Sequence, residues 1–142
     1  MMYTFKKDFA TVAVDKKNSL IVLKWLRQPT EEEFKATFAA SLETAQNYNL
    51  RRYLSINTLG INIDLSGQRW VATLGAETMQ HLSLERYARV LPRDAIQEII
   101  SHKIYENLQR LLPNTMQFSV FYEEEAAMRW LLQSEKKYSK KR

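Results

Sequence analysis

Blocks of alternating hydrophobic and polar residues predict strands near the start of the chain. Two segments, 10–15 (ATVAVD) and 20–26 (LIVLKWL), are rich in β-branched and aromatic residues, and the polar stretch DKKNS separates them. This pattern predicts a β-hairpin. Both alternating faces of the second segment are apolar, so we expect that strand to be central in its sheet.

Four later segments have the apolar spacing of helices. The first predicted helix begins near residue 31, where Thr30 and Glu33 have the spacing of a capping box. The second spans 65–82, and the third starts after Asp94. The third helix has an apolar stripe that we expect to be buried, comprising Ile96, Ile99, Ile100, Ile104, Leu108 and Leu111. The last helix is expected to face inward through Ala126, Ala127, Trp130 and Leu131.

Short strands are predicted between these helices, at 51–57, 87–91 and 116–122. The resulting order is β-β-α-β-α-β-α-β-α. Such alternation requires right-handed crossovers between parallel strands. We therefore predict an α/β fold with a mixed, mostly parallel sheet of about five strands. An antiparallel hairpin opens the sheet, and about four helices cover it.

Length and charge indicate one domain without a basic binding face. The chain has 142 residues, and we expect a single domain over 1–135 followed by a basic, disordered tail at 136–142. The net charge is +5, but the tail holds five basic residues and no acid, whereas 1–135 hold 16 basic and 16 acidic residues. The neutral body predicts no nucleic-acid binding. The lack of a long apolar run predicts no membrane insertion and a cytoplasmic location.

The residue types that carry most enzyme chemistry are sparse. Cysteine is absent, and His81 and His102 lie too far apart for a compact metal-ligand pattern. No glycine-rich phosphate loop and no nucleophile motif occur. The acidic triplets at 31–33 and 123–125 open predicted helices, where the helix dipole favours acids. We therefore expect no catalytic activity, no metal and no cofactor.

The C-terminal stretch FYEEEAAMRWL, at 121–131, joins an aromatic strand end to acids, alanines and a Trp-Leu pair. Trp70 follows Asp64 by six residues, RVLPRD at 89–94 ends a strand, and the first helix starts with acids. With the hairpin-first order, these features resemble small bacterial single-domain members of the STAS-like family. That fold is shared by the anti-sigma-factor antagonists and, more distantly, by CRAL-TRIO lipid-binding domains. The resemblance covers roughly 10–133 and implies a non-enzymatic protein-interaction or regulatory module.

The stretch DLSG, at 64–67, has two interpretations. In the anti-sigma-factor antagonists, a serine between the third strand and the second helix is a phosphorylation switch, and Ser66 has a similar place here. In this chain, however, the loop 58–63 separates the strand from DLSG. We favour a plain helix start with Asp64 as the N-cap, and keep Ser66 as a candidate phospho-switch.

Polar residues at the carboxyl ends of the predicted strands suggest a ligand crevice, because open parallel sheets bind ligands there. The candidates are Arg27, Asn57 and Arg93, since two arginines could hold a carboxylate or a phosphate. The alternative is that they are solvated loop residues that pair with Asp64, Asp94 or water.

Large apolar residues suggest what the protein binds. We expect the hairpin and the first two helices to carry more of them than one small core absorbs: Phe5, Phe9, Trp25, Phe34, Phe38, Tyr48 and Trp70. This surplus predicts a homodimer, and a regulatory protein partner is also expected. The alternative is a small-molecule or lipid carrier with an apolar pocket between the sheet and its helices.

Overall fold

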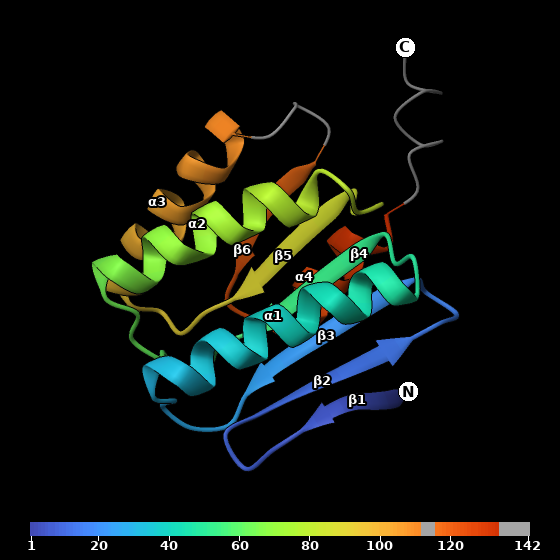
Figure 1. Ribbon diagram of the computed structural model, residues 1–142, viewed down its shortest axis with the longest axis horizontal. Coiled ribbons are helices and arrows are strands. Elements are labelled where there is room, and N and C mark those ends of the chain that lie inside the picture. Colours follow the sequence, from blue (N-terminus) through green and yellow to red (C-terminus); the bar gives the residue numbers. More distant parts are fainter. Residues whose placement is uncertain (112–115, 134–142) are drawn as a thin grey trace.

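A computed structural model describes residues 1–111 and 116–133 of the chain. Within these ranges the chain forms six strands and four helices (Figure 1). In order they are β1 (Met2–Lys6), β2 (Ala10–Asp15), β3 (Leu20–Trp25), α1 (Glu31–Asn47), β4 (Arg52–Ile56), α2 (Leu65–Met79), β5 (Arg86–Val90), α3 (Ala95–Leu111), β6 (Gln117–Phe121) and α4 (Glu124–Leu131). The expected tail at 136–142 lies outside the described residues.

The six strands form one sheet in the order of the sequence, β1-β2-β3-β4-β5-β6. β1, β2 and β3 are antiparallel neighbours, and β3 to β6 are parallel. Each parallel connection passes through a helix, as parallel strands require. The predicted α/β class, with an antiparallel hairpin that precedes parallel strands, is confirmed.

The helices cover the two faces of the sheet unequally. In Figure 1, α1, α2 and α3 lie in front of the sheet and α4 lies behind it. The larger core forms under the three front helices, around residues such as Leu23, Phe38 and Tyr53. The smaller core forms where Ala127 and Leu131 of α4 pack on the other face.

β1 is a sixth strand that the sequence pattern did not predict. Most of its residues are exposed, and Phe5 alone is half-buried. A strand at the edge of a sheet needs no apolar alternation, because pairing with one neighbour satisfies half of its backbone. β1 therefore exists through its pairing with β2, where Met2 lies opposite Val14 and Lys6 opposite Thr11.

The starts of α1 and α3 agree with the predicted positions. Thr30 and Glu33 form the expected capping box at the start of α1. Asp94 accepts a hydrogen bond from the backbone N–H of Ile96 at the start of α3. The second helix is shorter than expected, because α2 ends at Met79 instead of Leu82.

Only part of the predicted stripe on α3 is buried. Ile104 and Leu108 belong to the core, and Ile100 packs against it. Ile96 and Ile99 are 64% and 63% exposed, so the expectation that they face the core is wrong. Both residues lie in the first two turns of α3.

Most of the aromatic residues from which a homodimer was expected lie in or against the larger core. Phe9, Trp25, Phe34 and Phe38 are buried in the larger core, and Phe5 and Trp70 pack against it. Tyr48 is 37% exposed. The core therefore absorbs nearly all the side chains from which the homodimer was expected, and the dimer itself stays a prediction. On α4, Ala127 and Leu131 are buried as expected, whereas Ala126 and Trp130 are half-buried.

No helix in the described part of the chain is both long enough and apolar enough to span a lipid bilayer.

Candidate functional site

Ser66 is an exposed residue in the first turn of α2. The N-cap of this helix is Asp64, whose Oδ1 accepts a hydrogen bond from the Gly67 N–H at 2.7 Å. A Cβ at Gly67 would lie 2.6 Å from Cγ2 of Ile63, so glycine permits the close approach of the loop to the helix. The predicted cap is confirmed, and these contacts account for DLSG without a phosphate.

Arg27 follows β3, and carboxylates already pair its charge. Its guanidinium donates to both carboxylate oxygens of Glu33 at 3.0 Å and to Oδ1 of Asp8 at 3.3 Å. The hydrogen bond from Arg27 lowers the pKa of the Glu33 carboxyl, and the same hydrogen bond raises the pKa of Arg27. An anionic ligand would have to displace both carboxylates, which argues against Arg27 as a ligand residue.

Asn57 follows β4 and is fully buried. Its Oδ1 accepts a hydrogen bond from the backbone N–H of Ile61 at 2.8 Å, and its own backbone N–H donates to the carbonyl of Val90. Gln97 of α3 continues this network, because its side-chain amide donates to the carbonyls of Gly60 and Ile61 at 3.1 Å each. Asn57 therefore shapes the loop after β4 from inside the protein.

Arg93 is exposed, and its guanidinium lies 4.5 Å above the ring centre of Tyr122. The ion pairs found among the described residues do not include it. Arg27 and Arg93 follow β3 and β5, and β4 lies between these strands. Since neighbouring strands are about 4.8 Å apart, the two arginines leave the sheet roughly 10 Å apart and contact different partners. The structure does not gather Arg27, Asn57 and Arg93 into one crevice.

Two other arginines, Arg86 and Arg89, are buried on opposite faces of β5 and are 6% and 7% exposed. Arg86 lies on the face that α4 covers. Its guanidinium donates to the carbonyl oxygens of Trp130 and Gln133 at 2.6 and 2.9 Å. Arg52 of β4 similarly donates to the carbonyl of Leu131 at 2.8 Å. These carbonyls end α4, where the helix dipole favours positive charge, so both arginines have a structural role.

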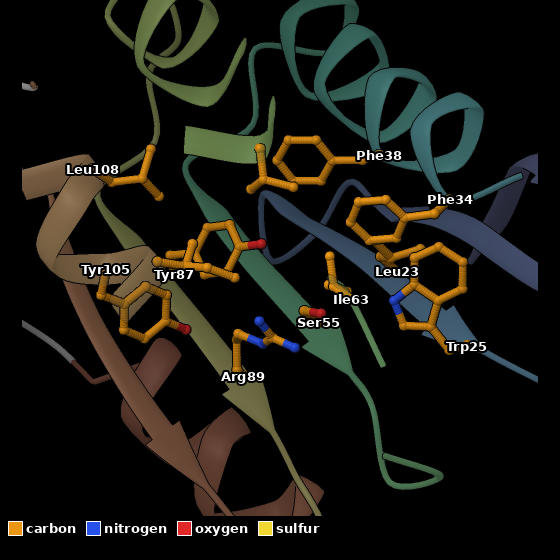
Figure 2. A pocket seen from close by; sticks show the side chains of 12 residues that line it. Leu23, Trp25, Phe34, Phe38, Ser55, Ile63, Tyr87, Arg89, Tyr105 and Leu108 are labelled. Carbon is orange, nitrogen blue, oxygen red and sulfur yellow. The ribbon is translucent and has the colours of Figure 1, made fainter. Parts of the chain in front are cut away.

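Arg89 lies on the other face, beneath α1, α2 and α3. In the sheet it is opposite Ser55 on one side and Val120 on the other. Figure 2 shows its guanidinium between the hydroxyl groups of Ser55 and Tyr105. Its Nε is buried and makes no hydrogen bond within the described residues, and the same holds for the Tyr105 hydroxyl. Arg89 therefore differs from Arg86, because no carbonyl or carboxylate of the described residues receives its Nε–H.

The Arg89 guanidinium borders a cavity of about 30 Å³ between the sheet and the helices. Its apolar walls come from the sheet and from all three front helices, and include Leu23, Trp25, Phe34 and Phe38 (Figure 2). Arg89 is the one charged residue among those that line it. We call this the Arg89 pocket. It combines a single cation with hydroxyl groups and apolar walls, which is a chemistry suited to a small anion.

The tyrosines at the Arg89 pocket are neutral. Burial raises the pKa of Tyr105 well above its usual value and also raises the pKa of Tyr87, and the nearby charge of Arg89 only partly opposes this rise. A phenolate therefore does not balance the Arg89 charge. The phenol of Tyr105 is instead a hydrogen-bond donor at the wall of the pocket.

Sequence reasoning did not select Arg89. The segment YARVL predicts a strand, and RVLPRD at 89–94 contributes only to the family resemblance, so neither gives Arg89 a role. The sequence does contain a pattern that could have identified it. Arg89 lies two residues after Tyr87, so both side chains are on the same face of the strand, and helices cover both faces of a parallel strand. An arginine inside such a strand is a buried cation and needs an explanation.

Among the described residues, no group of three or more His, Asp or Glu side chains gathers where it could hold a metal ion.

The fold and the pocket define the chain as an α/β protein with one mixed sheet and a buried cationic pocket on its three-helix face. Comparison of the chain with protein-family models, with curated proteins and with solved structures found no match.

Proposed function

We propose that the chain is a non-enzymatic protein-interaction or regulatory module with a STAS-like arrangement of strands and helices. Two features of the described residues support this proposal: the antiparallel strands that precede the parallel ones, and the position of α4 on the far face of the sheet. A cytoplasmic location, expected from the sequence, is part of it.

The observation that carries the proposal is a group of exposed apolar residues at the carboxyl edge of the parallel strands. Leu59, Leu65 and Ile96 are 59%, 59% and 64% exposed. They come from the loop after β4 and from the starts of α2 and α3, which lie at the same edge in Figure 1. Gln97 connects these segments, since its amide donates to Gly60, Ile61 and Asn62. We call Leu59, Leu65, Ile96 and the neighbouring Ile99 the edge patch.

Exposed apolar side chains on a stably held edge are typical of a protein-binding surface. The acids nearby have structural partners, because Glu33 pairs with Arg27, and Asp64 and Asp94 accept from backbone N–H groups. A protein-docking surface needs no free acid or base, so these observations favour binding over catalysis.

The alternative function, a lipid carrier, receives less support. Pockets for lipids and drug-sized ligands have volumes of several hundred Å³. The Arg89 pocket is about 30 Å³, and the core around it is closely packed. A more open hollow of about 380 Å³ lies between α3 and β6, but its lining includes the charged residues Glu98 and Glu106. A lipid tail would have to lie against these charges, which favours the interaction module.

Affinity capture with the full chain, followed by purification of the captured protein and calorimetry, tests the proposal. We expect a saturable complex that is at least about ten-fold weaker with Ile96→Glu or Leu59→Glu, because a charge in an apolar interface loses its hydration. Tyr3→Glu is the matched control, since Tyr3 is 54% exposed on β1 at the far edge of the sheet. The proposal is wrong if the purified partner binds the edge-patch variants as tightly as the wild type.

A further inference from the structure

Arg89 is a buried cation that has no ion-pair partner among the described residues. It is 7% exposed. Its Nε and the Tyr105 hydroxyl are both buried without a hydrogen-bond partner. Ser101, four residues before Tyr105 on α3, also has an unpartnered buried hydroxyl. Such groups are rare in folded proteins, because each loses its hydration without compensation.

Arg86, the other buried arginine of β5, has the contacts expected of a structural residue. Arg86 donates to two carbonyls at the end of α4 and lies 5.5 Å from the ring centre of Trp130. Arg89 has neither kind of contact among the described residues. A buried cation without a counter-charge lowers the stability of a fold, and replacing it by an apolar side chain of similar size is often stabilising. The position of Arg89 is therefore best explained by a negatively charged ligand.

We propose that the Arg89 pocket binds a small monocarboxylate, with the carboxylate on the Arg89 guanidinium and beside the Tyr105 hydroxyl. The planar guanidinium offers two parallel N–H groups that match the two oxygens of a carboxylate. The apolar end of the ligand faces Leu23, Trp25 and Phe34 on the opposite wall (Figure 2).

The charge and size of the pocket narrow the ligand class. Arg89 is the one charged residue of the lining, so it neutralises one negative charge and leaves a phosphate dianion with an excess charge in apolar surroundings. The volume of about 30 Å³ accepts the head group of a short acid and excludes a long acyl chain. This binding site goes beyond the proposed interaction module, because it lies beneath the helices and does not include the edge patch.

Thermal unfolding and calorimetry with sodium acetate test the proposal. Sodium chloride at equal ionic strength controls for screening, and acetamide is the neutral molecule of the same shape. At a concentration about ten-fold above the dissociation constant, we expect acetate to raise the unfolding midpoint by roughly 4 to 6 °C. Acetamide and chloride leave it unchanged. An equal shift with acetamide, or no shift with acetate, overturns the proposal.

Substitutions at the Arg89 pocket test whether the rise in the unfolding midpoint comes from acetate bound there. Arg89→Met removes the charge and keeps the length of the side chain, so we expect it to abolish the acetate shift and to raise the midpoint of the unliganded protein. Arg89→Lys keeps the charge without the planar fork and is expected to bind acetate about ten-fold more weakly. Tyr105→Phe removes one donor and weakens binding by roughly three- to ten-fold.

Arg93→Met is the matched control, because Arg93 is exposed near the end of the same strand. It should keep the full acetate response. A response that survives in Arg89→Met, or that disappears in Arg93→Met, contradicts the assignment. Octanoate tests the expected size of the ligand. If octanoate binds more tightly than acetate, the pocket accepts a long acyl chain, and the proposal of a short monocarboxylate is wrong.

Discussion

The phenol ring of Tyr53 on β4 stacks on that of Tyr87 on β5, with the ring centres 4.3 Å apart and the ring planes inclined by 9°. The two residues lie directly opposite each other in the parallel register. The Tyr53 hydroxyl lies 2.6 Å from the Ser41 hydroxyl of α1, so one of them donates to the other. This stack is the centre of the three-helix face, and Tyr105 meets Tyr87 edge-on at a ring-centre distance of 6.0 Å.

The buried tyrosines predict a loss of stability at high pH. Burial raises the pKa of Tyr53 and Tyr105 well above the usual value of 10.0 and also raises the pKa of Tyr87. Because the folded state holds these protons more tightly, their contribution is fully present below about pH 10 and is lost as the pH rises toward the folded-state values. We expect the urea midpoint to fall as the pH rises above about 10.

Absorbance of phenolate and circular dichroism, recorded together, check this prediction. The phenolate signal of these three residues should appear only with unfolding. Tyr53→Phe and Tyr105→Phe should each reduce the alkaline loss of stability. Full ionisation of all tyrosines in a protein with native circular dichroism contradicts the expectation.

Asp64 and Ser66 are expected to respond differently to substitution. Asp64→Ala removes the cap on the Gly67 N–H and should cost about 1 kcal/mol of unfolding free energy. Ser66→Asp places a negative charge in the first turn of α2, where the dipole favours it, so stability should change by less than about 0.5 kcal/mol. Chemical denaturation measures both, and light scattering should show an unchanged mass. Selective loss of a partner from folded Ser66→Asp would support the phospho-switch instead.

Asn57 is expected to be a structural residue. Asn57→Ala leaves the buried N–H of Ile61 without an acceptor and should destabilise the protein by about 2 to 3 kcal/mol. Thr58→Ala is the control, because Thr58 is the exposed neighbour and should cost less than about 0.5 kcal/mol. Urea denaturation measures the unfolding free energy of both variants. A small loss of stability for Asn57→Ala would contradict the structural role and would favour a role in ligand binding.

Trp130 anchors α4 on the sheet although it is only half-buried. Its ring lies 5.7 Å from that of Phe121 and packs over the Arg86 guanidinium. We expect Trp130→Ala to cost about 2 to 4 kcal/mol, near the lower end for a large aromatic residue because part of the ring is exposed. Arg129→Ala, at an exposed position of the same helix, should be nearly neutral. An unchanged denaturation midpoint for Trp130→Ala contradicts this role.

The expected homodimer is tested by light scattering. The core holds most of the aromatic residues from which the dimer was expected, so a dimer interface has to use exposed apolar residues such as those of the edge patch. A dimer should bury roughly 1,200 to 2,000 Å² in total. Ile96→Glu should then shift the mass toward the monomer, whereas truncation after Gln133 should leave it unchanged. A wild-type monomer at tens of micromolar contradicts the dimer.

Local patterns in the sequence were sufficient for the α/β class, the order of strands and helices along the chain after the hairpin, and the helix starts at Thr30, Asp64 and Asp94. The physical reason is that these features depend on neighbours in the chain. A capping side chain reaches an N–H two or three residues away, and apolar periodicity shows which elements have a face to bury. A crossover between parallel strands has one allowed hand, so the order of elements restricts the topology.

Tertiary structure alone decided the β1 strand, the exposure of Ile96 and the separation of Arg27 from Arg93. It also decided the place of Arg89, which the sequence shows only as one polar residue within a strand. The pairing of an edge strand, the angle at which a helix meets the sheet and the presence of a counter-charge all depend on residues far away in the chain. Two of the hydroxyl groups that share the pocket with Arg89 belong to Ser55 on β4 and Tyr105 on α3, and neither residue lies within ten residues of Arg89 along the sequence. The charge of a residue is set by its own chemistry, but whether that charge is paired is set by what the fold brings beside it.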